Sequence, residues 1–376
     1  MRIAIVCYPT YGGSGVVATE LGHALSIIGH EIHFITYKQP VRLDTLNENI
    51  FFHEVFVSEY DLFHYQPYEL ALSSRIVDVV KSYNIDLLHV HYAIPHAYAA
   101  YMAKMMLKDE GFNLPIVTTL HGTDITLVGS HPFYKTAVTF SINNSDYVTS
   151  VSNSLKADTE SLFNINKSIE VIPNFIDVNK HANQEKPFHR DSVADKKEKI
   201  LIHISNFRPL KRVVDVVKIF EKVQNEIPSK LLMVGEGPER IKVQRYVKKN
   251  QLRDKVLFFG KSNEINELLS YADIFLLPSE KESFGLVALE AMIHKVPVIS
   301  SNAGGLSEVN INGISGFLSK VGDIDNMAKN TIKILSNQST KKKFQEGAYK
   351  QATNFDISKI IPLYESVYTR VLKSFI

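Results

Sequence analysis

Short apolar runs alternate with longer amphipathic segments along this sequence. In the first half, the runs that predict strands span residues 2–8, 31–37, 50–57, 86–92, 116–122, 147–152 and 169–174. Amphipathic patterns at 16–28 and 71–83 predict helices between them. Continuous apolar runs are typical of strands covered on both faces, and this alternation is typical of parallel sheets with crossover helices.

The same alternation restarts in the second half. There the predicted strands span residues 199–205, 230–235, 255–260, 273–279, 296–301 and 316–319. Helical patterns occupy 213–223 and 263–272, whereas 181–199 has almost no apolar periodicity and is interpreted as a linker. From residue 324 onward the pattern predicts helix, interrupted at Phe355–Asp356 and bent at Pro362.

The predicted fold class is α/β, with two Rossmann-like, doubly wound domains that face each other across a cleft. The predicted boundaries are 1–180 for an acceptor-binding domain, 181–199 for the linker, 200–355 for a nucleotide-sugar-binding domain and 356–376 for a helix crossing back to the first domain. Ligands of such sheets bind beyond the carboxyl ends of the strands, so the loops at these ends are where functional residues are expected.

The length and charge of the chain favour two domains and argue against a nucleic-acid-binding protein. A chain of 376 residues is long for a single core, which favours two domains. The net charge of +2 comes from dispersed lysines and arginines, and the densest run, Lys341–Lys343, is interpreted as a solvated helix face. Nucleic acid is therefore not an expected partner, because nucleic-acid binding requires a concentrated basic surface.

The single cysteine and the apolar run lengths point to a cytoplasmic protein. Cys7 lies in an apolar strand and has no second cysteine to pair with, so a reducing compartment is expected. No apolar segment approaches the ~20 residues that cross a bilayer, so no membrane partner is expected. Residues from Met1 onward are expected to form a strand and not a signal peptide.

A glycine-rich loop follows the first predicted strand. Gly13 to Ala18 match G-x-G-x-x-[GA], the pattern that brings backbone N–H groups close to a phosphate. The nicotinamide interpretation requires an acidic residue at the end of the second strand, where this chain has Thr36, Tyr37 and Lys38. A plain tight turn remains an alternative interpretation.

Two further loops carry charged groups in the second half. Asn206, Arg208 and Lys211 follow one strand and precede a helix, which favours a cradle for a diphosphate. A basic turn facing solvent is the alternative. The turn at Gly235–Pro238 follows the next strand, and its glycines permit a close approach.

The most specific signal is the segment from Glu282 to Glu290. Glu282 lies after a strand, and Glu290 lies about two turns into an otherwise apolar helix. A carboxylate on such a helix needs a partner, and ribose hydroxyls supply hydrogen-bond donors. The backbone N–H groups from Phe284 to Leu286 would face an anion. A core lysine or a backbone cap as the partner of Glu290 is the alternative.

The spacing of Glu282 and Glu290, with the upstream basic loop and GEGPE, resembles the retaining glycosyltransferases of family 4, which have the GT-B fold. The resemblance covers essentially the whole chain. It extends to YPTYGGSGVVATELGHALSIIGHEIHFIT, LHVHYAIPHAYAAYMA, VTTLHGTDIT and LIHISNFRPLKRVVDVV, which are similar to the branch of the family that acts in bacillithiol biosynthesis. This resemblance implies transfer of N-acetylglucosamine from UDP-N-acetylglucosamine to L-malate, the first step of that pathway, with the α configuration kept.

The resemblance also implies roles for individual positions. The implied catalytic residues are His121, Lys211 and Glu282. The implied donor-binding residues are Gly13, Asn206, Arg208, Lys211, Gly260, Lys261, Glu282, Ser283, Phe284, Gly285, Leu286 and Glu290. The implied acceptor-binding residues are Ser14, Tyr92, His121 and Thr123. Relatives usually have an arginine where this chain has Asn206, so Arg208 is the expected second cation. A homodimer is also implied.

No metal or cofactor is expected. Asp323 and Asp325 form a D-x-D pattern, but they begin a predicted helix, where aspartate is a common cap. His89, His91, His96 and His121 invite a zinc interpretation, for which structural packing or an acceptor pocket are the alternatives. Asp124 is available as a nucleophile, but attack from the same face of the sugar is preferred. Lys38 and Arg42 are candidates for the malate carboxylates.

Other classes of protein remain open at this point. These are a GT-B transferase with a lipid or polysaccharide precursor as acceptor, a UDP-sugar epimerase, and a nucleotide-sugar-binding regulator without transfer activity. A pyridoxal-phosphate-dependent phosphorylase shares the architecture, but no lysine in the sequence is singled out for a Schiff base.

Overall fold

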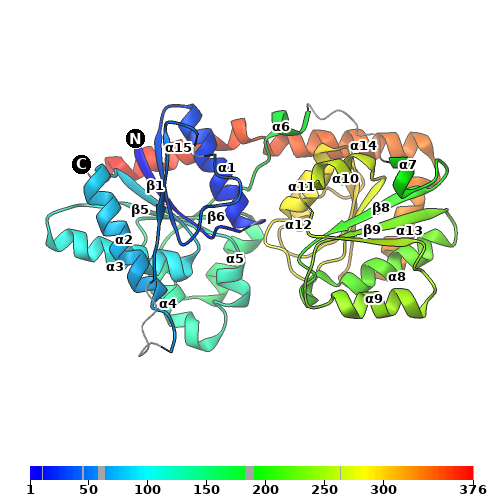
Figure 1. Ribbon diagram of the computed structural model, residues 1–376, viewed down its shortest axis with the longest axis horizontal. Helices are drawn as coiled ribbons and strands as arrows, with labels where there is room; N and C mark the ends of the chain where they lie inside the picture. Colours follow the sequence, from blue (N-terminus) through cyan, green and yellow to red (C-terminus); the bar gives the residue numbers. More distant parts are fainter. Residues whose placement is uncertain (11, 45, 58–63, 183–189, 263, 376) are drawn as a thin grey trace. The chain divides into compact units, whose positions relative to one another are not determined.

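The computed structural model of the chain describes residues 1–10, 12–44, 46–57, 64–182, 190–262 and 264–375. The chain forms two compact units (Figure 1). Unit 1 comprises Met1–Asn174 and Ile357–Ile376, and unit 2 comprises Phe175–Asp356. No helix among the described residues combines the length and the apolar character needed to cross a membrane.

Unit 1 is built on a seven-stranded parallel sheet with the order β3-β2-β1-β4-β5-β6-β7. Its strands are β1 (Arg2–Val6), β2 (Glu31–Thr36), β3 (Ile50–Glu54), β4 (Leu87–His91), β5 (Ile116–Leu120), β6 (Tyr147–Ser150) and β7 (Ile169–Val171). The central strands are buried along their length because helices cover both faces of the sheet.

The helices of unit 1 are α1 (Ser14–Ile27), α2 (Tyr68–Tyr83), α3 (Tyr98–Asp109), α4 (Pro132–Asn143), α5 (Asn153–Leu162) and α15 (Ile357–Lys373). Short irregular helical segments, η1 (Ala93–Ala97) and η2 (Thr123–Leu127), follow β4 and β5. Helices α2 and α3 bury one face of the sheet in a core that includes Val6, Ile76 and Ala103. Helix α15, from the other end of the chain, contacts α1 and continues through Pro362 (Figure 1).

Unit 2 repeats this architecture with a six-stranded parallel sheet of order β10-β9-β8-β11-β12-β13. Its strands are β8 (Lys199–Ile204), β9 (Ser229–Val234), β10 (Val256–Gly260), β11 (Ile274–Leu277), β12 (Val298–Ser301) and β13 (Gly316–Ser319). Counted from the first strand of each unit, the order 3-2-1-4-5-6 is common to both sheets, and it is the Rossmann order.

The helices of unit 2 contact one another in pairs. Helix α8 (Val213–Gln224) contacts α9 (Arg240–Lys249) and α13 (Ile324–Leu335), and α11 (Leu286–Ile293) contacts α10 (Ile265–Tyr271) and α14 (Gln338–Ala352). Helices α13 and α14 also contact each other (Figure 1). The remaining segments are short: α6 (Val178–Ala182), α7 (Arg190–Val193), η3 (Pro209–Lys211), α12 (Leu306–Val309) and η4 (Thr353–Phe355). Phe207, Phe220 and Leu276 belong to the core shared by α8, α9 and α13.

The structure confirms the strands predicted from the apolar runs, but many of them end earlier than predicted. For example, β1 ends at Val6, β4 at His91 and β5 at Leu120, so Tyr8, Tyr92 and His121 lie in loops. Within the predicted linker, α7 occupies Arg190–Val193, and residues 183–189 lie outside the described residues. The interruption before the last helix is confirmed, since η4 ends at Phe355 and α15 begins at Ile357.

The strand order places a topological switch point in each unit. In unit 1 it lies between β1 and β4, and in unit 2 between β8 and β11. At a switch point the chain leaves two neighbouring strands toward opposite faces of the sheet, which opens a crevice at their carboxyl ends. The loops that follow these four strands carry most of the residues implicated from the sequence.

Candidate active site

The loop after β8 carries the predicted cations of unit 2. Asn206 and Arg208 are exposed, and Lys211 ends the short helix η3 with its side chain only 17% exposed. The backbone N–H of Lys211 donates to the carbonyl oxygen of Arg208 at 2.9 Å. This turn presents cations at the carboxyl end of the first strand of the unit, where an anion of a bound ligand is expected.

The loop after β11 lies against the loop after β8. The ammonium group of Lys211 forms an ion pair with Oε1 of Glu282, and the same oxygen accepts a hydrogen bond from the buried Ser279 hydroxyl at 2.9 Å. The backbone N–H of Glu280 donates to the carbonyl oxygen of Leu210 at 2.7 Å. The predicted cation and the predicted carboxylate therefore meet at the switch point, although 71 positions separate them in the sequence.

The glycines of the GEGP turn have a packing role within unit 2, and their predicted approach to a ligand stays a prediction. A Cβ atom at Gly235, where φ is +120°, would overlap the carbonyl oxygen of Ser205. A Cβ atom at Gly237 would overlap that of Asn206. The close approach that requires glycine is therefore between this turn and the backbone of the loop after β8, which it supports from behind.

A second glycine pair supports the loop after β11 in the same way. Cβ atoms at Gly304 and Gly305 would overlap the carbonyl oxygens of Glu282 and Ser283, and the N–H of Gly305 donates to Glu282 at 2.9 Å. Each of the two loops at the switch point thus rests on a glycine turn from an adjacent strand. The positions of Lys211 and Glu282 depend on these backbone contacts.

Helix α11 begins at Leu286, four residues after Glu282. Gly285 precedes it with φ of +100°, and a Cβ there would lie 2.5 Å from Leu306. Phe284 is buried and packs edge-on against Phe355, with ring centroids 5.6 Å apart. Ser283, Leu286 and Glu290 are half-buried and form the rest of the predicted donor-binding set on this segment.

Gly260 and Lys261 lie at the end of β10, in the same unit. Gly260 has φ of +64° and accepts a backbone hydrogen bond from Gly235 at 2.6 Å, while Lys261 is exposed. The predicted uracil-contacting segment therefore adjoins the GEGP turn, at the carboxyl edge of the same sheet.

In unit 1 the loops after β1 and β4 meet at their own switch point. The Ser14 hydroxyl, at the start of α1, donates to the Tyr92 hydroxyl at 2.8 Å. Gly13 precedes α1 with φ of +62°, and a Cβ at Gly15 would lie 2.5 Å from the carbonyl oxygen of Tyr8. Of the GxG pair, Gly15 is required by packing within the loop, and Gly13 by its backbone conformation. Tyr11 of this motif lies outside the described residues.

Four histidine rings of unit 1 lie close together: His89, His91 and His96 are buried, and His121 is half-buried. Nδ1 of His91 and Nε2 of His121 lie 2.8 Å apart, and His89 is bonded to Thr119 and to the Tyr368 hydroxyl. Burial lowers the pKa of His121 and that of His89 to about 3, and that of His96 to about 4. At pH 7 the imidazole of His121 is therefore a neutral hydrogen-bonding group and cannot supply a proton as an imidazolium ion.

Asp124 is the buried carboxylate of this site. Its Oδ2 accepts the backbone N–H of Ala93 at 2.8 Å, and its Oδ1 accepts those of Gly122 at 2.9 Å and His121 at 3.3 Å. Burial raises the pKa of Asp124 to about 6, and these hydrogen bonds oppose the increase. Through Oδ2 the carboxylate joins its own loop after β5 to the loop after β4, and through Oδ1 it holds the start of its own loop. Thr123, the remaining predicted acceptor contact, begins the helical segment beside Asp124.

The structure does not assemble a metal site from the candidates. Both ring nitrogens of His89 are engaged by hydroxyl groups, and one nitrogen of His91 is engaged by His121. Within the described residues, no group of three or more His, Cys, Asp or Glu side chains is arranged to hold a metal ion. Asp323 caps α13 through the N–H of Asn326 at 3.1 Å, and Asp325 pairs with Lys222 at 2.9 Å.

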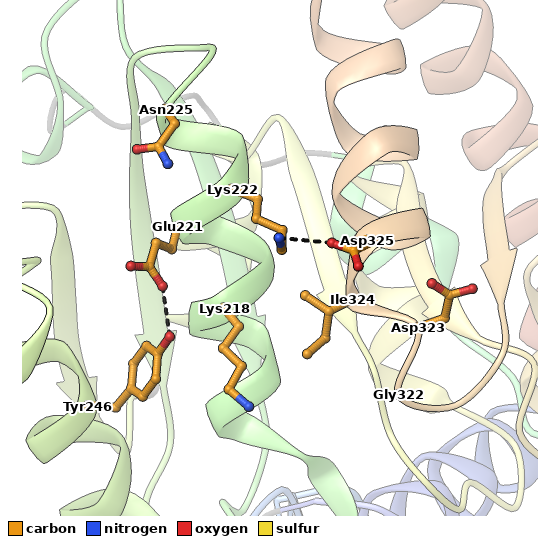
Figure 2. A pocket seen from close by; sticks show the side chains of 9 residues that line it. All are labelled: Lys218, Glu221, Lys222, Asn225, Tyr246, Gly322, Asp323, Ile324 and Asp325. Atoms are coloured by element: carbon orange, nitrogen blue, oxygen red, sulfur yellow. Dashed lines mark hydrogen bonds and ion pairs between the residues drawn. The ribbon is translucent and has the colours of Figure 1, made fainter.

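A pocket of about 470 Å³ lies elsewhere in unit 2, between α8, α9 and the start of α13. Figure 2 shows two pairs among its polar groups, Lys222 with Asp325 and the Tyr246 hydroxyl with Glu221. Asp323 and Asp325 of the D-x-D pattern line it, but none of the predicted catalytic, donor-binding or acceptor-binding residues does. The pocket is therefore separate from the candidate active site.

Two serines at the switch point of unit 2 are not identified by the sequence pattern: Ser279 bonds Glu282, and Ser205 bonds the backbone of the loop after β8. For Asp124 the sequence indicates a candidate nucleophile, whereas the structure shows a carboxylate that accepts backbone N–H groups. The available signal was a polar residue at the carboxyl end of an apolar run, as in KILIHIS or DIFLLPS. This signal does not reveal which backbone group such a side chain contacts.

Comparison with known proteins gives two family matches and a full-length relative. The family model described as Glycosyltransferase Family 4 matches residues 11–180, and that described as Glycosyl transferases group 1 matches residues 184–351. An N-acetyl-alpha-D-glucosaminyl L-malate synthase of Bacillus anthracis is 48% identical over 381 residues, which cover 99% of this chain and 98% of the relative.

Solved structures share the fold over nearly the whole chain. A sucrose-phosphate synthase from Thermosynechococcus elongatus aligns with a TM-score of 0.80 at 20% identity, over 99% of each chain. HepE from Anabaena, solved in complex with UDP-glucose, aligns with a TM-score of 0.81 at 18% identity, over 98% of this chain and 100% of that chain. The chain therefore belongs to the family 4 glycosyltransferases and has their GT-B fold.

Proposed function

We propose that this enzyme transfers N-acetylglucosamine from UDP-N-acetylglucosamine to the hydroxyl group of L-malate, the first step of bacillithiol biosynthesis. The observation that carries the proposal is the 48% identity, over 99% of the chain, to a protein named as an N-acetyl-alpha-D-glucosaminyl L-malate synthase. The aligned length spans the segments that carry both the donor-binding and the acceptor-binding candidates.

Unit 2 would hold the donor. In this proposal Lys211 and Arg208 meet the diphosphate, the first N–H groups of α11 face one of its phosphates, and Glu290 accepts hydrogen bonds from the ribose. Glu282 contacts the hydroxyl groups of the transferred sugar. Negative charge on the diphosphate grows as the glycosidic bond breaks, and preorganised cations and N–H groups stabilise this charge where it develops.

The chemical step is proposed to occur on one face of the sugar. The bond between the anomeric carbon and the diphosphate oxygen breaks, and a bond from that carbon to the malate hydroxyl oxygen forms. The hydroxyl proton passes to the departing phosphate oxygen, so configuration is kept without a covalent enzyme intermediate. The hydrogen bonding of Asp124 supports this route, because both of its oxygens are already engaged by backbone N–H groups.

Unit 1 would hold the acceptor. Ser14, Tyr92, His121 and Thr123 are the proposed contacts, all from loops at the carboxyl edge of its sheet. A dicarboxylate also requires cations or several N–H donors. The guanidinium group of Arg42 already lies 3.7 Å from the carboxylate of Glu20, whereas Lys38 is exposed. Of the two candidate cations for the malate carboxylates, we therefore favour Lys38. A metal-independent reaction, a homodimer and a cytoplasmic location belong to the proposal and stay predictions.

The experiment is incubation of the purified enzyme with UDP-N-acetylglucosamine and L-malate, followed by mass analysis of the products. We expect UDP release that depends on malate, and a product with the mass of the glycoside. Glu290→Ala should nearly abolish turnover. Glu226→Ala, a change of an exposed glutamate in the same unit, serves as the control and should leave turnover unchanged.

Parallel reactions separate this function from the alternatives. Transfer to glycerol phosphates or lipid acceptors, with none to malate, would identify a transferase with a different acceptor. Conversion of the donor in the absence of any acceptor would identify an epimerase. Tight binding of UDP-N-acetylglucosamine without transfer to any acceptor would favour a regulator. Each of these results would overturn the proposal.

A further inference from the structure

Strands β8 and β11 separate before they end, and a histidine side chain joins them there. Their backbone ladder pairs Ile274 with Leu201 and Phe275 with Ile202. Beyond this point, Nδ1 of the buried His203 lies 2.8 Å from the carbonyl oxygen of Leu276. The imidazole therefore bridges the two strands at the switch point of unit 2, directly beneath the loops that carry Lys211 and Glu282.

The opposite nitrogen of His203 continues this connection into the loop. Nε2 lies 2.8 Å from the Ser205 hydroxyl, and the same hydroxyl oxygen accepts the backbone N–H of Phe207 at 3.2 Å. A carbonyl oxygen only accepts hydrogen bonds, so Nδ1 of His203 carries the proton and Nε2 accepts from the Ser205 hydroxyl. We call this chain of hydrogen bonds, from Leu276 through His203 and Ser205 to Phe207, the relay. Every polar group in it has a partner. Burial lowers the pKa of His203 to about 4, with a smaller effect from the charge of Lys211, which keeps this tautomer neutral at pH 7.

The relay ends at a turn that is unfavourable by itself. Phe207 has φ of +40°, a conformation that residues with a Cβ rarely adopt. Its side chain is fully buried, and its carbonyl oxygen accepts the N–H of Glu239 at 3.0 Å. Asn206 lies within this turn and Arg208 follows it. The hydrogen bond from the Phe207 N–H to the Ser205 hydroxyl stabilises this turn. It therefore determines the direction in which the side chains of Asn206 and Arg208 point from the sheet.

We propose that His203, acting through Ser205, is a positioning residue for recognition of the donor diphosphate. It sets the turn from Ser205 to Phe207 and thereby the placement of the cations that follow, without touching the ligand itself. The inference rests on the proposed function, because it assumes that this loop binds the diphosphate of a nucleotide sugar.

The experiment compares UDP binding by calorimetry, and the KM values for donor and acceptor, among full-length variants. Ser205→Ala removes the hydroxyl of the relay. His203→Asn retains a donor for the Leu276 carbonyl oxygen but no longer reaches Ser205. We expect each variant to raise the Kd for UDP and the KM for UDP-N-acetylglucosamine by about fivefold to tenfold, the effect of losing one buried hydrogen bond. The KM for malate should stay unchanged. Ser205→Thr keeps the hydroxyl and should restore binding.

Ser229→Ala is the matched control. Ser229 is fully buried in the same unit, whereas Ser205 is half-buried, and the Ser229 hydroxyl donates to the carbonyl oxygen of Ile227 at 2.7 Å, at the amino end of the sheet. Ser229→Ala should lower the melting temperature at least as much as Ser205→Ala and leave UDP binding unchanged.

Two results would overturn the inference. The first is wild-type affinity for UDP in both Ser205→Ala and His203→Asn, and a lowered melting temperature in these variants would then show that the link from His203 to Phe207 only stabilises the fold. The second is failure of the wild-type enzyme to bind UDP, which would overturn the proposed function together with this inference.

Discussion

The ammonium group of Lys211 forms an ion pair with the carboxylate of Glu282, and so joins the two loops that leave the switch point of unit 2. Both side chains are largely removed from solvent, at 17% and 11% exposed. In the proposed reaction a diphosphate approaches the same cation. Glu282 and the ligand then compete for Lys211, which makes the pair a means of holding the cation in place until the donor arrives.

This competition predicts opposite effects for the two partners on UDP binding. Glu282→Gln removes the competing charge, so UDP should bind as tightly as to the wild type or more tightly. Lys211→Met should weaken UDP binding about tenfold or more, because a charged hydrogen bond contributes roughly 1.5–3 kcal/mol. Transfer should fall in both variants. Calorimetric titration with UDP and steady-state rates measure these effects, and an equal loss of UDP affinity in the two variants would contradict the argument.

The glycine turn after β9 predicts a specific cost for adding one methyl group. Gly235→Ala should destabilise the protein by more than about 2 kcal/mol, since the left-handed conformation costs roughly 1–2 kcal/mol and a clash with Ser205 is added. The control is Gly313→Ala, where φ is +79° but no atom lies within 4 Å of the new Cβ. Denaturant unfolding measures both, and equal losses would show that the backbone contact with Ser205 is unimportant.

Asp124→Asn tests whether the carboxylate of Asp124 stabilises the two loops through its hydrogen bonds or acts as a nucleophile. One carboxylate oxygen becomes an amide group that faces a backbone N–H in either orientation, which should cost about 1–3 kcal/mol of stability. With slow donors, mass spectrometry should detect no sugar attached to the wild-type enzyme. A sugar ester on Asp124 would refute same-face attack. Asp109→Asn, at an exposed helix end, is the control for the stability measurement.

Tyr92→Phe tests the acceptor side. The substitution removes the hydroxyl that accepts from Ser14 at 2.8 Å and leaves the ring contact with Tyr8, whose centroid is 5.3 Å away. The KM for malate should rise about fivefold to tenfold, as expected for one lost hydrogen bond, and the Kd for UDP should not change. Tyr134→Phe, an exposed tyrosine of the same unit, is the control. A weaker affinity for UDP with an unchanged KM for malate would move Tyr92 to the donor site.

The buried histidines predict loss of stability in mild acid. The pKa is lowered to about 3 for His89 and His121 and to about 4 for His96 and His203, against about 6.5 in the unfolded chain. Between pH 6.5 and 4 the unfolded state binds protons that the folded state does not. The free energy of unfolding therefore falls with falling pH, by up to about 1.4 kcal/mol per pH unit for each histidine.

Asp124 acts in the opposite direction, because its pKa is raised to about 6 in the folded state. Its protonation stabilises the folded state as the pH falls from about 6 toward the ordinary value of about 3.9. One carboxyl group opposes several histidines, so the net effect in this window is destabilisation. Urea unfolding between pH 7.5 and 5 measures it. If the free energy of unfolding stayed constant or increased toward pH 5, the histidine rings could not all be neutral in the folded state.

Much of the fold is predictable from local patterns. The apolar runs identify the strands of both sheets, because a strand buried on both faces reads as a continuous apolar run. The ends of strands are less predictable. Tyr92 and His121 directly follow apolar runs in the sequence, but they lie in loops because β4 ends at His91 and β5 at Leu120. Glu282 and Lys211 are identifiable as candidate functional residues because they follow strands of such a sheet at the edge where ligands bind.

The sequence alone is sufficient for the two-sheet architecture, for the loops that carry chemistry and for the family, because periodicity and short motifs are local properties of the chain. The pairing of Lys211 with Glu282, the bracing of both loops by glycine turns, and the link from His203 through Ser205 follow only from the folded arrangement. These contacts join residues from neighbouring strands that are far apart in sequence. A hydrogen bond or a steric contact depends on distances of a few ångström in space. The spacing of residues along the chain does not determine these distances.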